Sequence, residues 1–214
     1  MATADSGLDI PTSGLYAWWD FNNPSSYTAG GSTVTDLSGN GNDGNVGSVL
    51  TTALDGGVRY VQGDGSTVGD TNSISLPQDV TTDLATFSFA FVVKIPVSSN
   101  QVWLKAVNAS GNYIAQNPTG NFYYSGIGTP TAVYQNASVD SSSIETTDGW
   151  KLRTWTGLSG TSSAFINGLS IGGYFNDFQL DGQIVAALIY DRTITASEVS
   201  QIYTAYDTVI DLDT

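Results

Sequence analysis

The sequence predicts an all-β protein, an antiparallel β-sandwich with one short C-terminal helix. Short segments of alternating apolar and polar residues recur along the chain, separated by Gly, Asn, Ser and Thr, which is the rhythm of a sandwich or barrel. Only 12% of the 214 residues are charged and 24 are glycine, a composition typical of β-proteins with many turns. Only one segment, 195–206, has the periodicity of an amphipathic helix.

The clearest strand is predicted over residues 87–95. Alternate residues of this segment, including Phe87, Phe89 and Phe91, share one face, and we expect that face in the core because strand side chains alternate. Residues 182–192 are apolar on both faces, as in a central strand that is covered on each side. The other strands are predicted at 15–21, 58–62, 73–77, 102–107, 112–116, 121–125, 131–136, 150–157 and 162–170.

Two local signals mark a hairpin and the helix. Asn167-Gly168 is the strongest short hairpin signal, because a type I′ turn needs positive φ at both central positions. Thr195 and Glu198 form a capping box that starts the helix. No internal repeat or linker divides the chain. We therefore expect a flexible N-terminal arm over 1–13 and a single domain over 14–214.

Several motifs follow one another in a recognisable order. They are "GLYAWWDF" (14–21), "DLSGNGNDG" (36–44), "FSFAFVVK" (87–94), "DGWKLRTWTG" (148–157), "FINGLS" (165–170) and "LDGQIVAALIYDRTITASEVSQIY" (180–203). Together they resemble the laminin-G-like domains of the concanavalin A-like lectin superfamily. The resemblance implies a jelly-roll sandwich. It also implies a non-catalytic module that binds glycans, proteins or surfaces, often with calcium.

The segment "TDLSGNGNDG" allows two interpretations. Asp36, Ser38 and Asn40 alternate oxygen-bearing side chains like the first half of an EF-hand loop, and Asp43 or Asp20 could add charge from nearby. These five residues are the candidate Ca²⁺ ligands. The alternative is a Gly/Asn-rich turn in which the side chains of Asp36 and Asn40 form hydrogen bonds with the local backbone.

Five aromatic residues are candidates for ligand binding because aromatic faces can stack on sugar rings and tyrosine hydroxyls add polar contacts. They are Trp103, Tyr113, Tyr123, Tyr124 and Tyr134. Since neighbours in a strand point to opposite faces, we expect one of the adjacent pair Tyr123 and Tyr124 to fill the core.

Charge and composition exclude several function classes. With 20 acidic and 6 basic residues the net charge is −14, which disfavours nucleic acid and anionic membrane surfaces as partners. The chain has no histidine and no cysteine, so a nucleophile–base pair is hard to assemble. Its two glutamates, Glu145 and Glu198, are far apart in sequence, whereas glycan hydrolysis needs paired carboxylates. We therefore expect no enzymatic activity.

The absence of a signal peptide leads to the functional hypothesis. A lone recognition module that starts at Met1 without an export signal suits a phage virion protein. We expect a capsid decoration or tail-associated protein on the virion surface that binds a glycan or another virion protein, with a trimer as the expected oligomer. The alternatives are an extracellular or cell-surface bacterial carbohydrate-binding or adhesion module, cut from a larger secreted protein, and a glycan hydrolase.

Overall fold

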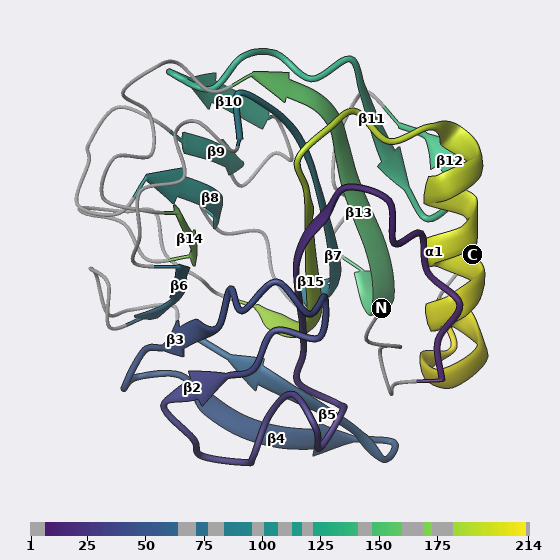
Figure 1. Ribbon diagram of the computed structural model, residues 1–214. Coiled ribbons are helices and arrows are strands. Elements are labelled where there is room, and N and C mark those ends of the chain that lie inside the picture. Colours follow the sequence, from purple (N-terminus) through teal and green to yellow (C-terminus); the bar gives the residue numbers. More distant parts are fainter. Residues whose placement is uncertain are drawn as a thin grey trace.

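The computed structural model describes residues 7–63, 72–76, 84–95, 101–106, 113–116, 122–140, 147–159, 169–172 and 182–212. In these residues two antiparallel sheets face each other, and the described helix lies against the outer side of one sheet (Figure 1). The predicted fold class is confirmed. In this part of the chain no helix is long and apolar enough to span a membrane.

The first sheet has eight strands, seven of which follow one another in hydrogen-bonded order. That order is β12 (Ser138–Val139), β11 (Ala132–Gln135), β13 (Thr147–Ser159), β7 (Thr86–Ile95), β15 (Gln183–Tyr190), β5 (Val58–Gln62) and β4 (Thr51–Asp55). The eighth strand, β1 (Leu15–Asp20), pairs with β15. Strand β15 therefore has β7 along one side, and on the other side it pairs first with β5 and then with β1.

The second sheet has seven strands. Its order is β10 (Phe122–Ser125), β9 (Tyr113–Gln116), β8 (Gln101–Ala106), β14 (Leu169–Gly172), β6 (Ser73–Leu76), β3 (Gly44–Val46) and β2 (Thr33–Val34). The short strands β2 and β3 are not predicted from the sequence because they are too short to show alternation. The predicted Asn167-Gly168 turn lies outside the described residues.

Strand β4 is also absent from the sequence-based prediction, although a signal for it is present. Gly56 and Gly57 join β4 to β5, and both have positive φ, 58° and 93°. A two-residue turn of this kind matches the twist of the flanking strands and is favoured in hairpins. The Gly-Gly pair before the "VRYVQ" strand would therefore have indicated the hairpin.

Aromatic side chains dominate the core between the sheets. Phe87, Phe89 and Phe91 point into it and are fully buried, as their alternation predicts. Trp155 of β13 stacks beside Phe89 with a distance of 6.0 Å between ring centroids. The facing sheet contributes aliphatic side chains such as Ile114. Each such side chain contributes roughly 1.5–3 kcal/mol through burial of apolar surface.

A second core lies on the outer side of the eight-stranded sheet, under helix α1 (Ala196–Ile210). Val185 and Leu188 of β15 face Val199, Ile202 and other apolar residues of the helix there. Because Ile184, Ala187 and Ile189 of the same strand belong to the inner core, β15 is buried on both faces. The prediction of a central strand covered on each side is confirmed.

The helix starts where the sequence predicts. Thr195 and Glu198 form the capping box, in which the Glu198 backbone N–H donates to Thr195 Oγ1 at 3.3 Å and Glu198 Oε2 accepts from the Thr195 backbone N–H at 2.8 Å. The helix runs beyond the predicted end at 206 and ends at Asp211, whose φ of 59° is left-handed.

Arg192 ties the start of the helix to the N-terminal segment. Its Nε and Nη2 donate to the Ser13 carbonyl at 2.9 and 2.7 Å, and its Nη1 donates to Glu198 Oε2 at 3.0 Å. The guanidinium holds the pKa of Glu198 well below its usual range, at about 2. This residue links the loop after β15, the helix N-terminus and the segment before β1.

Residues 7–13 lie beside α1 rather than free of the domain (Figure 1). Ile10 is buried in the outer core, the Pro11 carbonyl accepts from the Tyr190 hydroxyl at 3.1 Å, and Asp9 accepts from Gln201 of the helix at 3.2 Å. The structure therefore differs from the predicted arm over 1–13, because apolar residues in this segment complete the outer core. Residues 1–6 lie outside the described residues.

A buried polar network connects β1 to the helix. Trp18 Nε1 donates to the Tyr206 hydroxyl at 2.8 Å, and that hydroxyl donates to Asp20 Oδ2 at 3.3 Å. The backbone N–H groups of Asn22 and Asn23 donate to Asp20 Oδ1. Burial raises the pKa of Asp20 from 3.8 to about 6, and these hydrogen bonds offset only part of that effect.

The buried Asp20 predicts how stability depends on pH. Its pKa is higher in the folded than in the unfolded protein, so the folded state is favoured while the carboxyl is protonated. The free energy of unfolding should therefore fall as pH rises from about 4 to about 6, by at most about 3 kcal/mol. Urea denaturation across this pH range measures the slope.

Asp20→Asn is the matched control because its side chain is neutral at every pH. It should flatten the slope between pH 4 and 6. The Glu198 carboxyl, whose lowered pKa affects stability as pH falls below about 4.5, is unchanged in the variant, so its contribution cancels when the two profiles are compared. Parallel profiles for the wild type and the variant would contradict the assignment to Asp20.

Candidate functional site

The segment 35–44 forms a turn centred on the carboxylate of Asp36, which is 7% exposed. Its Oδ1 accepts from the backbone N–H groups of Trp18 at 2.9 Å and Ser38 at 2.8 Å. Its Oδ2 accepts from the Ser38 hydroxyl at 2.6 Å and the Asn42 N–H at 3.0 Å. Gly39 and Gly41 have φ of 84° and 77°, a conformation that glycine adopts without strain.

The asparagines of this turn bind the neighbouring strand. Asn40 Nδ2 donates to the Leu15 carbonyl at 2.7 Å, and both Asn40 and Asn42 donate to the Tyr16 carbonyl. Asp43 Oδ1 accepts from the Asp36 backbone N–H at 2.8 Å. The segment therefore provides side-chain hydrogen-bond partners for the backbone at the open edge of β1.

This arrangement differs from a calcium coordination shell. The oxygens of Asp36 face N–H and O–H donors, and those of Asp20 belong to the buried network with Tyr206. Among the described residues no three acidic, histidine or cysteine side chains converge in a way that could hold a metal ion. Calcium binding by Asp20, Asp36, Ser38, Asn40 and Asp43 stays a prediction.

Two of the five candidate aromatic residues lie together on the outer face of the seven-stranded sheet. Tyr123 of β10 pairs with Ala115 of β9, and Tyr113 pairs with Ser125, so the two tyrosines are diagonal neighbours on one face. Diagonal neighbours are roughly 7–8 Å apart, within reach of one ligand. Tyr123 is 48% exposed and Tyr113 is half-buried.

The other three candidates lie elsewhere or are only partly defined. Tyr124 packs against the core between the sheets, so the expected division of the pair Tyr123 and Tyr124 holds. Tyr134 is buried in the outer core, which lies between the eight-stranded sheet and α1. The backbone of Trp103 lies at a bulge of β8, between Val102 and Leu104.

A row of polar residues crosses the seven-stranded sheet in register with Tyr113. The successive cross-strand pairs are Ser125–Tyr113, Tyr113–Lys105, Lys105–Ser170, Ser170–Ser75, Ser75–Asn45 and Asn45–Thr33. The neighbouring row holds Ile114 and Ile74, which are buried between the sheets. Since neighbouring residues in a strand point to opposite faces, the described side chains of this row point away from the core. Thr33 and Asn45 at one end are exposed, and Tyr113 at the other end is half-buried.

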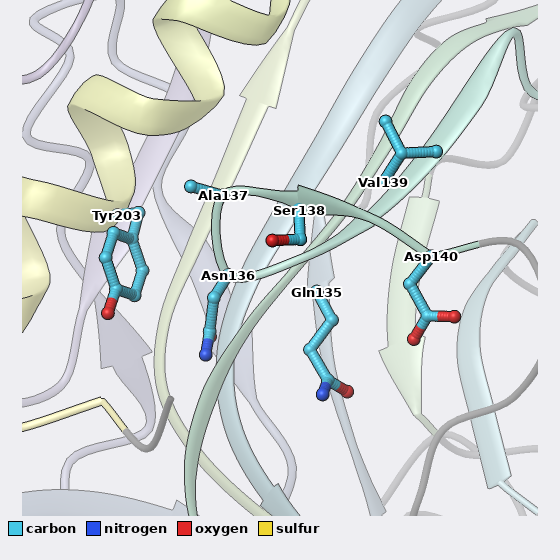
Figure 2. Close-up of a pocket in the computed structure, with 7 residues that line it drawn as sticks. All are labelled: Gln135, Asn136, Ala137, Ser138, Val139, Asp140 and Tyr203. Carbon is cyan, nitrogen blue, oxygen red and sulfur yellow. The ribbon is translucent and has the colours of Figure 1, made fainter.

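A separate pocket of about 420 Å³ lies between the β11–β12 hairpin and helix α1 (Figure 2). It is lined by Gln135, Asn136, Ala137, Ser138, Val139 and Asp140 of the hairpin and by Tyr203 of the helix. This pocket is on the opposite sheet from Tyr113 and Tyr123.

The sequence does not predict the pocket. Tyr203 falls within the predicted helix 195–206, and residues 135–140 have no motif that predicts binding. Two weak signals are present. Tyr203 directly follows the buried Ile202 and so lies at the border of the apolar face, and Asn136 can adopt the left-handed φ of a tight turn.

Asp36→Ala tests the structural role of the 35–44 turn. Removal of the carboxylate leaves the buried N–H groups of Trp18 and Asn42 without their acceptor, which should lower the free energy of unfolding by roughly 2–4 kcal/mol. Urea denaturation measures the loss. Asp43→Ala, which removes one acceptor at an exposed residue, should cost clearly less. Equal losses would contradict a central role for Asp36.

The calcium prediction is tested by thermal denaturation with calcium and with EDTA. A ligand that binds only the folded state raises the melting temperature as its concentration rises above Kd. A calcium-dependent shift that Asp43→Asn reduces would confirm the prediction. Identical melting curves at millimolar calcium would contradict it and leave the segment as a turn.

Comparisons with known proteins concern the fold. The sequence matches no protein-family model and no curated protein. A Trypanosoma rangeli sialidase in complex with sialic acid is 16% identical with a TM-score of 0.59, over 97% of this chain and 35% of the sialidase. The binding domain of Paraclostridial Mosquitocidal Protein 1 is 13% identical with a TM-score of 0.54, over 90% of this chain and 52% of that chain.

A third solved structure is domain 4 of AbnA, a GH43 extracellular arabinanase from Geobacillus stearothermophilus, in complex with arabinotriose. It is 18% identical with a TM-score of 0.49, over 88% of this chain and 98% of that chain. The chain thus spans about a third of the sialidase and about half of the toxin structure. Because both identities are below 25%, the first two likenesses show a β-sandwich fold shared with the matched parts of those proteins and nothing beyond it.

Proposed function

We propose that this protein is a non-catalytic carbohydrate-binding module whose ligand lies on the outer face of the seven-stranded sheet. The observation that carries the proposal is the placement of Tyr113 and Tyr123 on adjacent strands with the same outward face. Two rings at this spacing offer neighbouring stacking surfaces for a sugar chain. The binding domain of the toxin, which shares the fold, is consistent with a binding role.

The surroundings of the two tyrosines support a polyhydroxylated ligand. Ser125 is the cross-strand partner of Tyr113, and hydroxyl and amide side chains such as Ser75 and Asn45 continue the same row farther along the sheet, roughly 4.8 Å per strand away. Sugar hydroxyls both donate and accept hydrogen bonds, as these groups do. This face is open to solvent at Tyr123, whereas α1 covers the outer face of the other sheet.

The charge of the protein favours neutral glycans. At a net charge of −14 the protein repels anionic ligands over distances of about a Debye length. A sialylated or uronic acid-containing chain would approach against this field. We therefore expect neutral sugars to be preferred, in contrast to the sialic acid bound by the sialidase that shares the fold.

The acidic residues support a role without catalysis. Glu198 is held at the helix cap by Arg192 and Thr195, and Asp36 and Asp20 accept hydrogen bonds from buried or backbone donors. Glycan hydrolysis needs two carboxyl groups about 5–10 Å apart that flank the scissile bond. None of these three carboxylates lines the face that carries Tyr113 and Tyr123.

The virion role is a more specific form of the same proposal. A glycan-binding module could act on a phage virion, as a capsid decoration or tail-associated protein, or at a bacterial surface as an adhesion module. Detection of the chain in purified virions by mass spectrometry would support the first setting. Light scattering of the purified protein would test the expected trimer.

Replacement of Tyr123 tests the proposed site. On an array of neutral glycans, Tyr123→Ala should weaken binding about tenfold, or ~1.4 kcal/mol, because a stacking surface is lost. Tyr123→Phe keeps the ring and should retain most of the binding.

Leu54→Ala is the matched control for this experiment. Leu54 is 66% exposed on β4 of the other sheet, so its replacement should leave binding unchanged. If Tyr123→Ala and Tyr113→Ala both bind like the wild type, this face is not the glycan site.

A further inference from the structure

The pocket between the β11–β12 hairpin and Tyr203 is not used by the proposed function. It belongs to the edge of the eight-stranded sheet, next to α1, whereas Tyr113 and Tyr123 belong to the seven-stranded sheet. Its volume of about 420 Å³ falls within the range of small-molecule sites, roughly 300–1,000 Å³.

The hairpin wall of the pocket is held rigidly to the sheet. The backbone N–H of Asn136 donates to the Leu152 carbonyl at 2.7 Å, and its side-chain Oδ1 accepts from the Leu152 N–H at 3.0 Å. At the other end of the hairpin, Asp140 Oδ2 accepts from Arg153 Nη1 at 3.2 Å. Arg153 is 1% exposed, so this anchor lies within the protein.

The opposite wall is the ring of Tyr203. Its neighbours in the helix, Ile202 and Tyr206, are fully buried in the outer core, so the helix cannot turn about its axis without loss of that packing. Burial, followed by the charges of Asp207 and Asp211, raises the pKa of Tyr203, and its hydroxyl stays protonated near neutral pH. In Figure 2 the ring lies beside Asn136 and Ala137.

The polar groups of the pocket suit hydroxyl ligands. The side chains of Gln135, Asn136 and Asp140 point to the same side of the hairpin in Figure 2, whereas Val139, the cross-strand partner of the buried Tyr134, points to the other side. Amide groups both donate and accept hydrogen bonds, as does the hydroxyl of Ser138, and a carboxylate accepts them. Sugar hydroxyls can pair with every one of these groups.

Charge narrows the class of ligand further. Asp140 is the one charged residue among the seven that line the pocket, and its carboxylate faces the buried Arg153. Because this ion pair is neutral overall, the pocket itself adds little charge, and the −14 net charge of the protein is what disfavours an anion there. An uncharged ligand avoids this penalty.

We propose that this pocket is a second binding site, which takes one or two residues at the end of a neutral glycan. Tyr203 provides the stacking surface, and Gln135, Ser138 and Asp140 bind the sugar hydroxyls. The pocket is built from residues other than Tyr113 and Tyr123. The protein would therefore hold sugars at two separate places, one at each sheet.

The test is an array of neutral glycans and their sialylated counterparts, probed with the wild type and four variants of the full chain. Tyr203→Ala removes the stacking ring, and Ser138→Trp fills the pocket from an exposed position that has no role in the core. For at least a subset of neutral glycans, both changes should weaken binding about tenfold. Tyr203→Phe should preserve binding to that subset, and Leu54→Ala should preserve all binding.

Three results would overturn the inference. The first is unchanged binding of every neutral glycan by both Tyr203→Ala and Ser138→Trp. The second is a pocket-dependent preference for sialylated glycans. The third is no binding of any neutral glycan by the wild type, which would overturn the proposed function as well.

Tyr123→Ala, measured on the same array, separates the two proposals. If it alone reduces binding, the proposed function holds and the pocket is not a site. If Tyr203→Ala and Ser138→Trp alone reduce binding, the pocket is the site and the Tyr113–Tyr123 face is not. Melting curves of all variants check that each is folded.

Discussion

Double-sided burial of strand β15 is the constraint on which the structure depends. Seven of its eight residues are buried, with Ile184 and Ile189 toward the facing sheet and Val185 and Leu188 toward α1. The strand can be stable only if both layers form, because each layer removes a different set of apolar side chains from water. The N-terminal segment, β1 and the helix therefore have to assemble on the same strand, although they come from opposite ends of the sequence.

The same constraint determines where ligands can bind. Helix α1 and residues 7–13 take up much of the outer side of the eight-stranded sheet, so open surface there is limited to its edges, such as the β11–β12 hairpin. The seven-stranded sheet has an outer row of polar and tyrosine residues in its described part. One sandwich thus offers two separate surfaces, the tyrosine face of one sheet and the pocket beside α1 at the edge of the other.

Much of the fold could be predicted because the signals are local. The alternation at Phe87, Phe89 and Phe91 and the capping box at Thr195 depend only on neighbouring residues. The pocket could not be predicted, because it requires residue 203 to meet residues 135–140. Nor could the sequence decide whether the Asp36 carboxylate binds a metal or the backbone, since that depends on β1, whose Trp18 N–H reaches it from 18 positions away.

The course of the two ends of the described chain affects how the domain would be oriented on a larger particle. Residues 7–13 run beside α1, and residues 211–212 directly follow the helix, so both ends of the described chain lie on the α1 side of the sandwich (Figure 1). Any polypeptide joined to either end would leave from that side. If the domain were tethered through either end, its seven-stranded sheet would lie on the side opposite the attachment point and would face the surroundings.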